Sequence, residues 1–255
     1  MRILIVRHAD PDYEHDSITE KGRREAELLA TRLSAIPATA YYVSPMGRAK
    51  ETAAYTLEKM HRDATVLPWL AEFRGFTVDH KTGKLRIPWD FRTTTWASHP
   101  LLFDRNKWTE DPLMQGGDVA DIWRETKEGI DALLAMHGYI RNDCVYHCEN
   151  NSDDTLVLFC HYAIGMAALA YLTNMPPVPM WHSFLFPTSS VTTLITQERT
   201  RGEIEFRCIS AGDISHLLQG NEQCSLRGLF PEIYNGVEST DPSIWPCTSP
   251  IPVIR

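Results

Sequence analysis

The sequence lacks any hydrophobic run of the ~18 residues that a membrane-spanning helix needs. Its longest apolar stretches, Leu156–Phe159 and Ala163–Leu172, are far shorter. The apolar N-terminus is interrupted by Arg7 and His8, so we expect no signal peptide. These absences predict a cytoplasmic protein that has no membrane partner.

Basic residues and cysteines are also scarce. The chain has 25 Lys and Arg against 33 Asp and Glu, a net charge of −8, which argues against a nucleic-acid partner. Six cysteines in 255 residues are too few for a disulfide scaffold and fit a reducing compartment. Cys144 and Cys148 could suggest zinc, but no second pair at ligand spacing follows them. We therefore expect neither a metal nor another cofactor.

Strands and helices alternate in the first part of the chain. A length of 255 residues is sufficient for a single domain with a sizeable core. Apolar periodicity, with Thr19 as a helix N-cap, predicts the elements of a sheet covered by helices. These are strands at Ile3–Val6, Ala40–Val43 and Thr65–Leu67, and helices at Thr19–Leu33 and Gly47–Met60.

Residues 74–115 interrupt this alternation and are rich in tryptophan, proline and basic residues. We interpret them as an insertion over one end of the sheet. Trp89, Trp96 and Arg92 either line a substrate pocket or, in the case of the tryptophans, form a small core for the insertion. The remaining predictions are helices at Asp118–His137 and Ala163–Leu172, a strand at Leu156–Cys160, an antiparallel hairpin of Ser190–Thr196 and Glu203–Ser210, and an irregular tail over 221–255.

Cationic side chains follow the ends of three predicted strands. Arg7 and His8 end the first strand, and His161 ends "LVLFCHYAIG". In "SPMGRAKETA", Arg48 falls in the first turn of a helix, where anions are favoured. Ligands of open α/β sheets bind at the carboxyl ends of the strands. Guanidinium groups suit phosphoryl oxygens, so we expect an anion site at this edge.

The two histidines predict chemistry at that site. A neutral imidazole can attack phosphorus through one nitrogen when the other donates its hydrogen to a backbone carbonyl, and a second imidazole can stabilise the developing charge. Glu72, in "LPWLAEFRGF", could protonate the leaving oxygen as a carboxylic acid, while Asp10 is an alternative acid. Each residue alone is more often structural, but their joint appearance at successive strand ends favours catalysis.

The motifs "RHA", "DSITEKGRREAELLA", "SPMGRAKETA", "LAEF" and "FCHYAIG" resemble the phosphoglycerate-mutase-like branch of the histidine phosphatase superfamily. "SSVTTL" and "GDISHL" resemble its late strands, so the match covers about 1–75 and 150–218. The resemblance implies a three-layer α/β/α sandwich with a mostly parallel central sheet. It also implies a phosphohistidine on His8, phosphate contacts from Arg7, Arg48 and His161, and a proton donor at Glu72. Ala9 departs from the glycine that is usual in the family.

We therefore expect a metal-independent phosphomonoesterase acting on a small phosphorylated metabolite. A mutase-type phosphotransferase is the alternative, although "GKLRIPWDFRTTTW" resembles no mutase segment. A catalytically silent phospho-ligand sensor is a further alternative. It is disfavoured because the nucleophile, His8, and the acid, Glu72, are both present. A metal-dependent hydrolase using His8, Asp10 and His161 is disfavoured, because Arg7 and Arg48 would repel a cation. The natural substrate, and whether the protein is a monomer or a homodimer, are left open.

Overall fold

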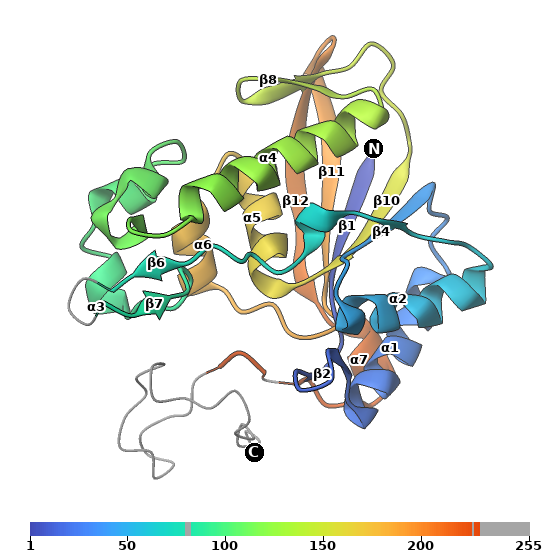
Figure 1. The fold of residues 1–255 in the computed structure, drawn as a ribbon. Helices are drawn as coiled ribbons and strands as arrows, with labels where there is room; N and C mark the ends of the chain where they lie inside the picture. Colours follow the sequence, from blue (N-terminus) through green and yellow to red (C-terminus); the bar gives the residue numbers. More distant parts are fainter. Residues whose placement is uncertain (80–82, 226, 230–255) are drawn as a thin grey trace.

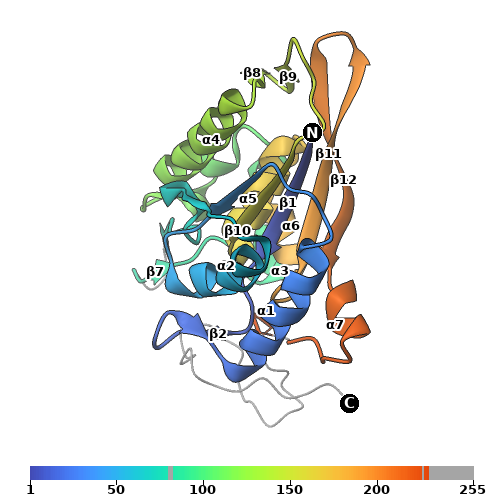
Figure 2. The ribbon, with the colours of Figure 1, turned by 90° about the vertical axis from the view of Figure 1, so that its right-hand side faces the viewer.

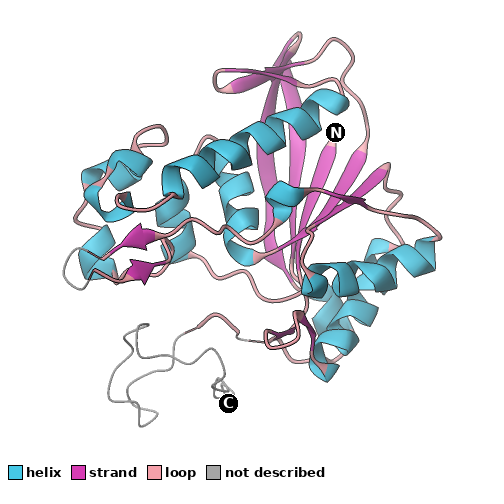
Figure 3. Cartoon of the chain, in the orientation of Figure 1, coloured by secondary structure: helices cyan, strands magenta, loops and turns pink. Residues whose placement is uncertain are grey.

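The computed structural model describes residues 1–79, 83–225 and 227–229. A single large sheet forms its centre, as Figures 1 and 3 show. This sheet has eight strands. Its strands are, in spatial order, β5 (Thr65–Val66), β4 (Ala40–Val43), β10 (Thr155–Cys160), β1 (Arg2–Arg7), β11 (Val191–Thr200), β12 (Glu203–Asp213), β9 (Val145–His147) and β8 (Ile140–Asn142). Two small sheets pair β2 (Pro11–Asp12) with β3 (Ser17–Ile18), and β6 (Thr77–Val78) with β7 (Leu85–Arg86).

The strands from β5 to β1 are parallel, and those from β11 to β8 pair antiparallel. Helices cover both faces, which confirms the predicted sandwich (Figures 1 and 2). One face carries α1 (Glu20–Leu33), α2 (Gly47–Met60) and α7 (Ser215–Gln219), and the other carries α4 (Val119–Met136), α5 (Tyr162–Leu172) and α6 (Pro177–Ser183). A mixed α/β fold with a parallel half therefore supports the strand ends of interest.

Side-chain alternation in β1 explains the two helical layers. Ile3 and Ile5 belong to the buried cluster that includes α4 and α5, whereas Leu4 and Val6 belong to the cluster of α1 and α2. Successive residues of a strand point to opposite faces, so an unbroken apolar strand must be covered on both sides. The unbroken apolar run Ile3–Val6, which is buried throughout, is thus the sequence signature of the central place of β1 in the sheet.

The register of the parallel strands brings three strand ends to one level. Arg7 in β1 pairs with Cys160 in β10, and the backbone N–H of His8 donates to the Cys160 carbonyl at 2.9 Å. The N–H of Ser44, which follows β4, donates to the Phe159 carbonyl at 2.9 Å. The residues that follow β1, β4 and β10 therefore lie beside one another.

The insertion packs as a small aromatic extension of the α4–α6 layer. It contains α3 (Thr93–Trp96) and the 3₁₀ turns η2 (Pro100–Phe103), η3 (Trp108–Glu110) and η4 (Pro112–Met114), and another turn, η1 (Pro68–Leu70), precedes it. Trp96 and Trp108 are buried, and Trp89 lies 6.1 Å from Trp181, centroid to centroid. Of the two interpretations of these tryptophans, the packing supports a core.

Most of the expected elements are present. The helix at Gly47–Met60 is confirmed with its predicted bounds, and the Thr19 side chain caps α1 by accepting from the N–H of Gly22. The hairpin of β11 and β12 is longer than predicted and turns at Arg201-Gly202. The hairpin of β8 and β9 was not predicted, because its strands are three residues long. The predicted tail lies outside the described residues from 230 onward.

No helix within residues 1–79, 83–225 and 227–229 is both long enough and apolar enough to cross a membrane.

Candidate active site

His8 and His161 face each other at the strand ends, with ring centroids 5.1 Å apart. Nδ1 of His8 lies 2.7 Å from the backbone oxygen of Ala9. A carbonyl oxygen can only accept, so Nδ1 carries the hydrogen and Nε2 keeps its lone pair. Burial, with further contributions from Arg7 and Arg48, holds the pKa of His8 well below its usual range. His8 is therefore a neutral imidazole with a nucleophilic Nε2.

Ser44 is the hydrogen-bond partner of the second histidine, His161, at its Nε2. Its hydroxyl oxygen lies 2.7 Å from Nε2 of His161 and accepts from the N–H of Met46 at 3.2 Å. When the hydroxyl donates its hydrogen to Nε2, the ring hydrogen of His161 lies on Nδ1. Nδ1 is buried and has no partner among the described residues. Burial again lowers the pKa of His161, with contributions from His8 and the nearby arginines, so the ring is a neutral donor.

Arg7 is the last residue of β1, and its guanidinium is held at both ends. Nη1 donates to the Phe186 carbonyl at 2.5 Å, and Nη2 donates to the Arg227 carbonyl at 3.3 Å. The guanidinium also lies over the ring of Tyr162, 5.4 Å from the centroid. Nε is buried without a partner in the described part of the chain. This nitrogen is therefore a donor that is available to a ligand.

Arg48 lies in the first turn of α2 and pairs with Asp16, which precedes β3. Nη1 donates to one Asp16 oxygen at 2.7 Å, and the other oxygen accepts from the N–H of Gly47 at 2.6 Å. The ring of Tyr13 packs against the guanidinium at 5.5 Å. Nε of Arg48, like that of Arg7, is buried and lacks a partner among the described residues. The hairpin of β2 and β3 thus sets the position of Arg48.

Glu72 joins the site through the first turn of α5. Its Oε1 accepts from the N–H groups of Phe73, Ala163 and Ile164 at 2.9, 3.0 and 3.1 Å. None of the described residues donates to Oε2 in the same way, so Oε2 is the oxygen that can carry a proton. Burial raises the pKa of Glu72 and outweighs the N–H groups of Phe73 and Ile164 and the charges of Arg48 and Arg7, which favour the carboxylate. The group is suited to act as an acid.

Comparison with known proteins identifies this arrangement. Residues 3–206 match the model of a protein family, the "Histidine phosphatase superfamily (branch 1)". The chain belongs to this superfamily. A 2,3-bisphosphoglycerate-dependent phosphoglycerate mutase from Thermoplasma acidophilum is 24% identical over 176 residues, which are 60% of this chain and 78% of the mutase.

Solved structures of three phosphatases have the same fold. A phosphoserine phosphatase mutant from Entamoeba histolytica, in complex with phosphoserine, aligns with a TM-score of 0.56 and 18% identity over 85% of this chain and 98% of that one. A mycobacterial glucosyl-3-phosphoglycerate phosphatase gives 0.54 and 21% over 83% and 98%. The α-ribazole phosphatase from Shigella flexneri gives 0.54 and 17% over 84% and 97%. At these identities the likeness establishes the fold.

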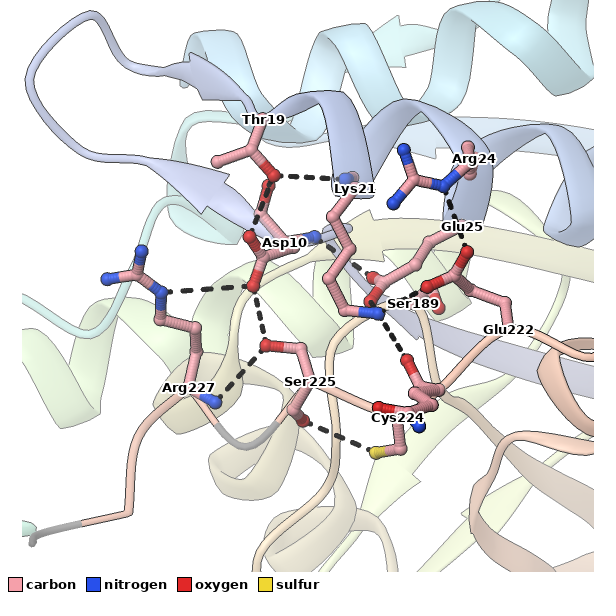
Figure 4. Close-up of polar contacts among 12 residues, drawn as sticks. Asp10, Thr19, Lys21, Arg24, Glu25, Ser189, Glu222, Cys224, Ser225 and Arg227 are labelled. Atoms are coloured by element: carbon pink, nitrogen blue, oxygen red, sulfur yellow. Dashed lines mark hydrogen bonds and ion pairs between the residues drawn. The ribbon is translucent and has the colours of Figure 1, made fainter. Parts of the chain in front are cut away.

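Asp10, the alternative acid, has other hydrogen-bond partners in this chain. Its Oδ1 accepts from the Ser225 hydroxyl at 2.5 Å and its Oδ2 from the Thr19 hydroxyl at 2.7 Å, as Figure 4 shows. Because both oxygens are engaged, Asp10 does not form one donor set with His8 and His161. This arrangement favours Glu72 as the acid.

The structure brings together the five predicted site residues, Arg7, His8, Arg48, Glu72 and His161. Sequence reasoning missed Ser44 and Asp16. Ser44 could have been found, because it follows a predicted strand as His8 and His161 do. No sequence signal identified Asp16, since its contact with Arg48 spans 32 residues and depends on how the β2–β3 hairpin folds back.

Proposed function

We propose that this chain is a phosphomonoesterase that works through a phosphohistidine on His8. The observation that carries the proposal is a set of three buried nitrogens that have no partner within the described residues: Nε of Arg7, Nε of Arg48 and Nδ1 of His161. Leaving a buried polar group without a hydrogen bond costs about 1–3 kcal/mol. A phosphoryl group, with several acceptor oxygens, would satisfy all three at once.

The first half-reaction forms a bond between Nε2 of His8 and phosphorus. The ester bond from phosphorus to the substrate oxygen breaks, and Oε2 of Glu72 gives its proton to that oxygen, so the alcohol leaves uncharged. The guanidinium groups of Arg7 and Arg48 and the N–H of His161 stabilise the charge on the phosphoryl oxygens. Fixed donors of this kind need no reorganisation during the reaction.

The second half-reaction returns the enzyme to its starting state. Glu72, now a carboxylate, takes a proton from a water molecule as the water oxygen attacks phosphorus. The bond between phosphorus and Nε2 of His8 breaks, and inorganic phosphate leaves. Each group ends with the proton that it had at the beginning.

Small phosphorylated metabolites are the proposed substrates. The support comes from the solved structures with this fold, whose names refer to phosphoserine, glucosyl-3-phosphoglycerate and α-ribazole phosphatases. The similarity to the phosphoglycerate mutase from Thermoplasma acidophilum favours phosphotransfer to a second hydroxyl as the other candidate function. The two functions differ in whether water or an alcohol takes the phosphoryl group from His8.

Phosphate release from a panel of sugar, nucleotide and acid phosphates tests the proposal. We expect turnover with at least one monoester and an acid-labile phosphoenzyme, both absent from His8→Ala. Because His8 stands at a strand end, the variant should fold. Turnover by a pure, folded His8→Ala protein would contradict the nucleophile assignment. Transfer of a labelled phosphoryl group from the phosphoenzyme to 3-phosphoglycerate, and not to water, would favour the mutase.

A chelator separates this mechanism from that of a metal-dependent hydrolase. Two arginines provide the positive charge that a divalent cation would otherwise supply, so activity should survive excess EDTA. Activity that disappears with EDTA and returns with a divalent ion would overturn the mechanism.

Phosphate binding without any turnover of the panel of phosphate monoesters would support a catalytically silent sensor instead of an enzyme.

A further inference from the structure

Residues 222–225 and 227–228, which we call the C-terminal strap, lie across the N-terminal half of α1 and the loop that follows β1. Figure 4 shows side chains of the strap meeting Asp10, Lys21 and Arg24. None of these contacts belongs to the reaction described above. They connect the end of the described chain to its beginning. One residue of the strap, Arg227, also contacts Arg7.

Glu222 provides the first anchor of the strap. One of its oxygens lies 2.6 Å from Nζ of Lys21 and the other accepts from Nε of Arg24 at 2.9 Å. Nζ of Lys21 also donates to the Gln223 carbonyl and lies 3.7 Å from the buried carboxyl of Glu25. Exposed ion pairs contribute little, but the Glu222 side chain is only 17% exposed and has two cationic partners. This end of the strap is therefore fixed to α1.

Ser225 and Asp10 provide the second anchor, which is buried on both sides. The Ser225 hydroxyl donates to Asp10 at 2.5 Å and accepts from the N–H of Arg227 at 3.3 Å. Nε of Arg227 lies 3.8 Å from the same Asp10 oxygen. Hydrogen bonds to a buried carboxylate are stronger than neutral ones. Asp10, two residues after the nucleophile, thus holds the strap against the site.

The anchors place the Arg227 carbonyl 3.3 Å from Nη2 of Arg7. The Phe186 carbonyl holds Nη1 of the same guanidinium from the other side. With both terminal nitrogens engaged, rotation of the guanidinium is restricted and only Nε remains unpartnered among the described residues. A donor that is already oriented loses less entropy when it binds an anion.

We propose that the C-terminal strap is a positioning element, in which Asp10 and Glu222 act through Ser225 and Arg227 to orient Arg7 for phosphate binding. The inference rests on the proposed function, because it needs Arg7 as a phosphate ligand. It assigns to Asp10 an anchoring role in place of acid catalysis. It also makes the phosphate affinity of the site depend on residues more than 200 positions from His8 in the sequence.

Point variants in the full-length chain test this proposal. We expect Ser225→Ala and Glu222→Ala to raise the KM for p-nitrophenyl phosphate, and the Kd for inorganic phosphate by calorimetry, by about tenfold with little change in kcat. Ser225→Thr, which keeps the hydroxyl, should restore both values. Charge reversal in Glu222→Lys should be partly rescued by Lys21→Glu. Glu128→Ala, which removes an exposed ion pair on α4, is the matched control.

Two results would overturn the proposal. Folded Ser225→Ala and Glu222→Ala proteins that keep the wild-type Kd would remove the positioning role. Tighter phosphate binding in these variants would make the strap an obstacle and not a support. In both cases the wild type still binds and hydrolyses monoesters, so the proposed function stands. A wild-type protein that neither binds phosphate nor hydrolyses the panel would overturn both proposals.

Discussion

The hydroxyl of Ser44 and Nε2 of His161 are 2.7 Å apart, and a hydroxyl that donates to Nε2 keeps the ring hydrogen of His161 on Nδ1. His8 also carries its hydrogen on Nδ1, but there the Ala9 carbonyl accepts it, so the nitrogen that His8 leaves free is the unprotonated Nε2. In the proposed mechanism, two histidines with rings 5.1 Å apart thus have different roles, His8 as nucleophile and His161 as donor. Their partners set the difference.

Ser44→Ala should lower kcat/KM for phosphate monoesters by about tenfold, the usual effect of losing one oriented hydrogen bond. Without the hydroxyl, His161 can place its hydrogen on Nε2 and lose the donor at Nδ1. Imidazole ¹⁵N chemical shifts would report the change of tautomer directly. If both kcat/KM and the tautomer of a folded variant are unchanged, Ser44 has only a structural role.

Glu72→Gln should damage the hydrolysis of alkyl phosphates far more than the release of nitrophenol from p-nitrophenyl phosphate. Loss of a general acid typically costs ~10²–10⁴ in rate, and a good leaving group needs little protonation. The nitrophenol burst measures the first half-reaction alone. Equal losses for both substrates would indicate that Glu72 positions α5 and does not donate a proton.

Asp10→Asn is the control for this experiment, and we expect no dependence on the leaving group. Because Asp10 anchors the C-terminal strap, its substitution should change KM in both substrates alike. A strong leaving-group dependence in Asp10→Asn, with none in Glu72→Gln, would make Asp10 the acid.

The pH dependence of kcat/KM should reflect two opposite shifts. Burial lowers the pKa of His8, so the nucleophile stays neutral below its usual pKa of ~6.5 as the pH falls. Burial raises the pKa of Glu72, so the acid stays protonated above the ~4.3 of an ordinary glutamate as the pH rises. We therefore expect an acid-side optimum for alkyl phosphates, with rates that fall as Glu72 loses its proton. Rates that rise steadily to alkaline pH would contradict this assignment.

Gly47→Ala should destabilise the protein by roughly 1–3 kcal/mol, the usual cost of overpacking. A Cβ at this position would lie 2.1 Å from the Asp16 carbonyl oxygen, a backbone atom that cannot move without displacing the β2–β3 hairpin. The loss of contact between Asp16 and Arg48 should also weaken phosphate binding. Lys50→Ala, on the exposed side of the same helix, should leave thermal unfolding and phosphate affinity unchanged.

Local patterns predicted the parts of this site that depend on strands and helices. An apolar strand followed at once by Arg7 and His8 must end at the carboxyl edge of the sheet, and the same holds for His161. Arg48 follows from the start of α2 at Gly47, which the periodicity predicted. The structure places these residues beside one another because parallel strands in register bring their ends together whatever the loops do.

The tertiary structure alone decided which of these groups are free to react. Asp10 and Glu72 are both candidate acids by sequence. Ser225, which is 215 residues from Asp10, donates to one oxygen of Asp10. The N–H groups at the start of α5 bind only Oε1 of Glu72 among the described residues. Likewise, the tautomer of His161 depends on Ser44, 117 residues before it. A hydrogen bond between distant residues depends on the packing of whole elements, which neither periodicity nor spacing along the chain encodes.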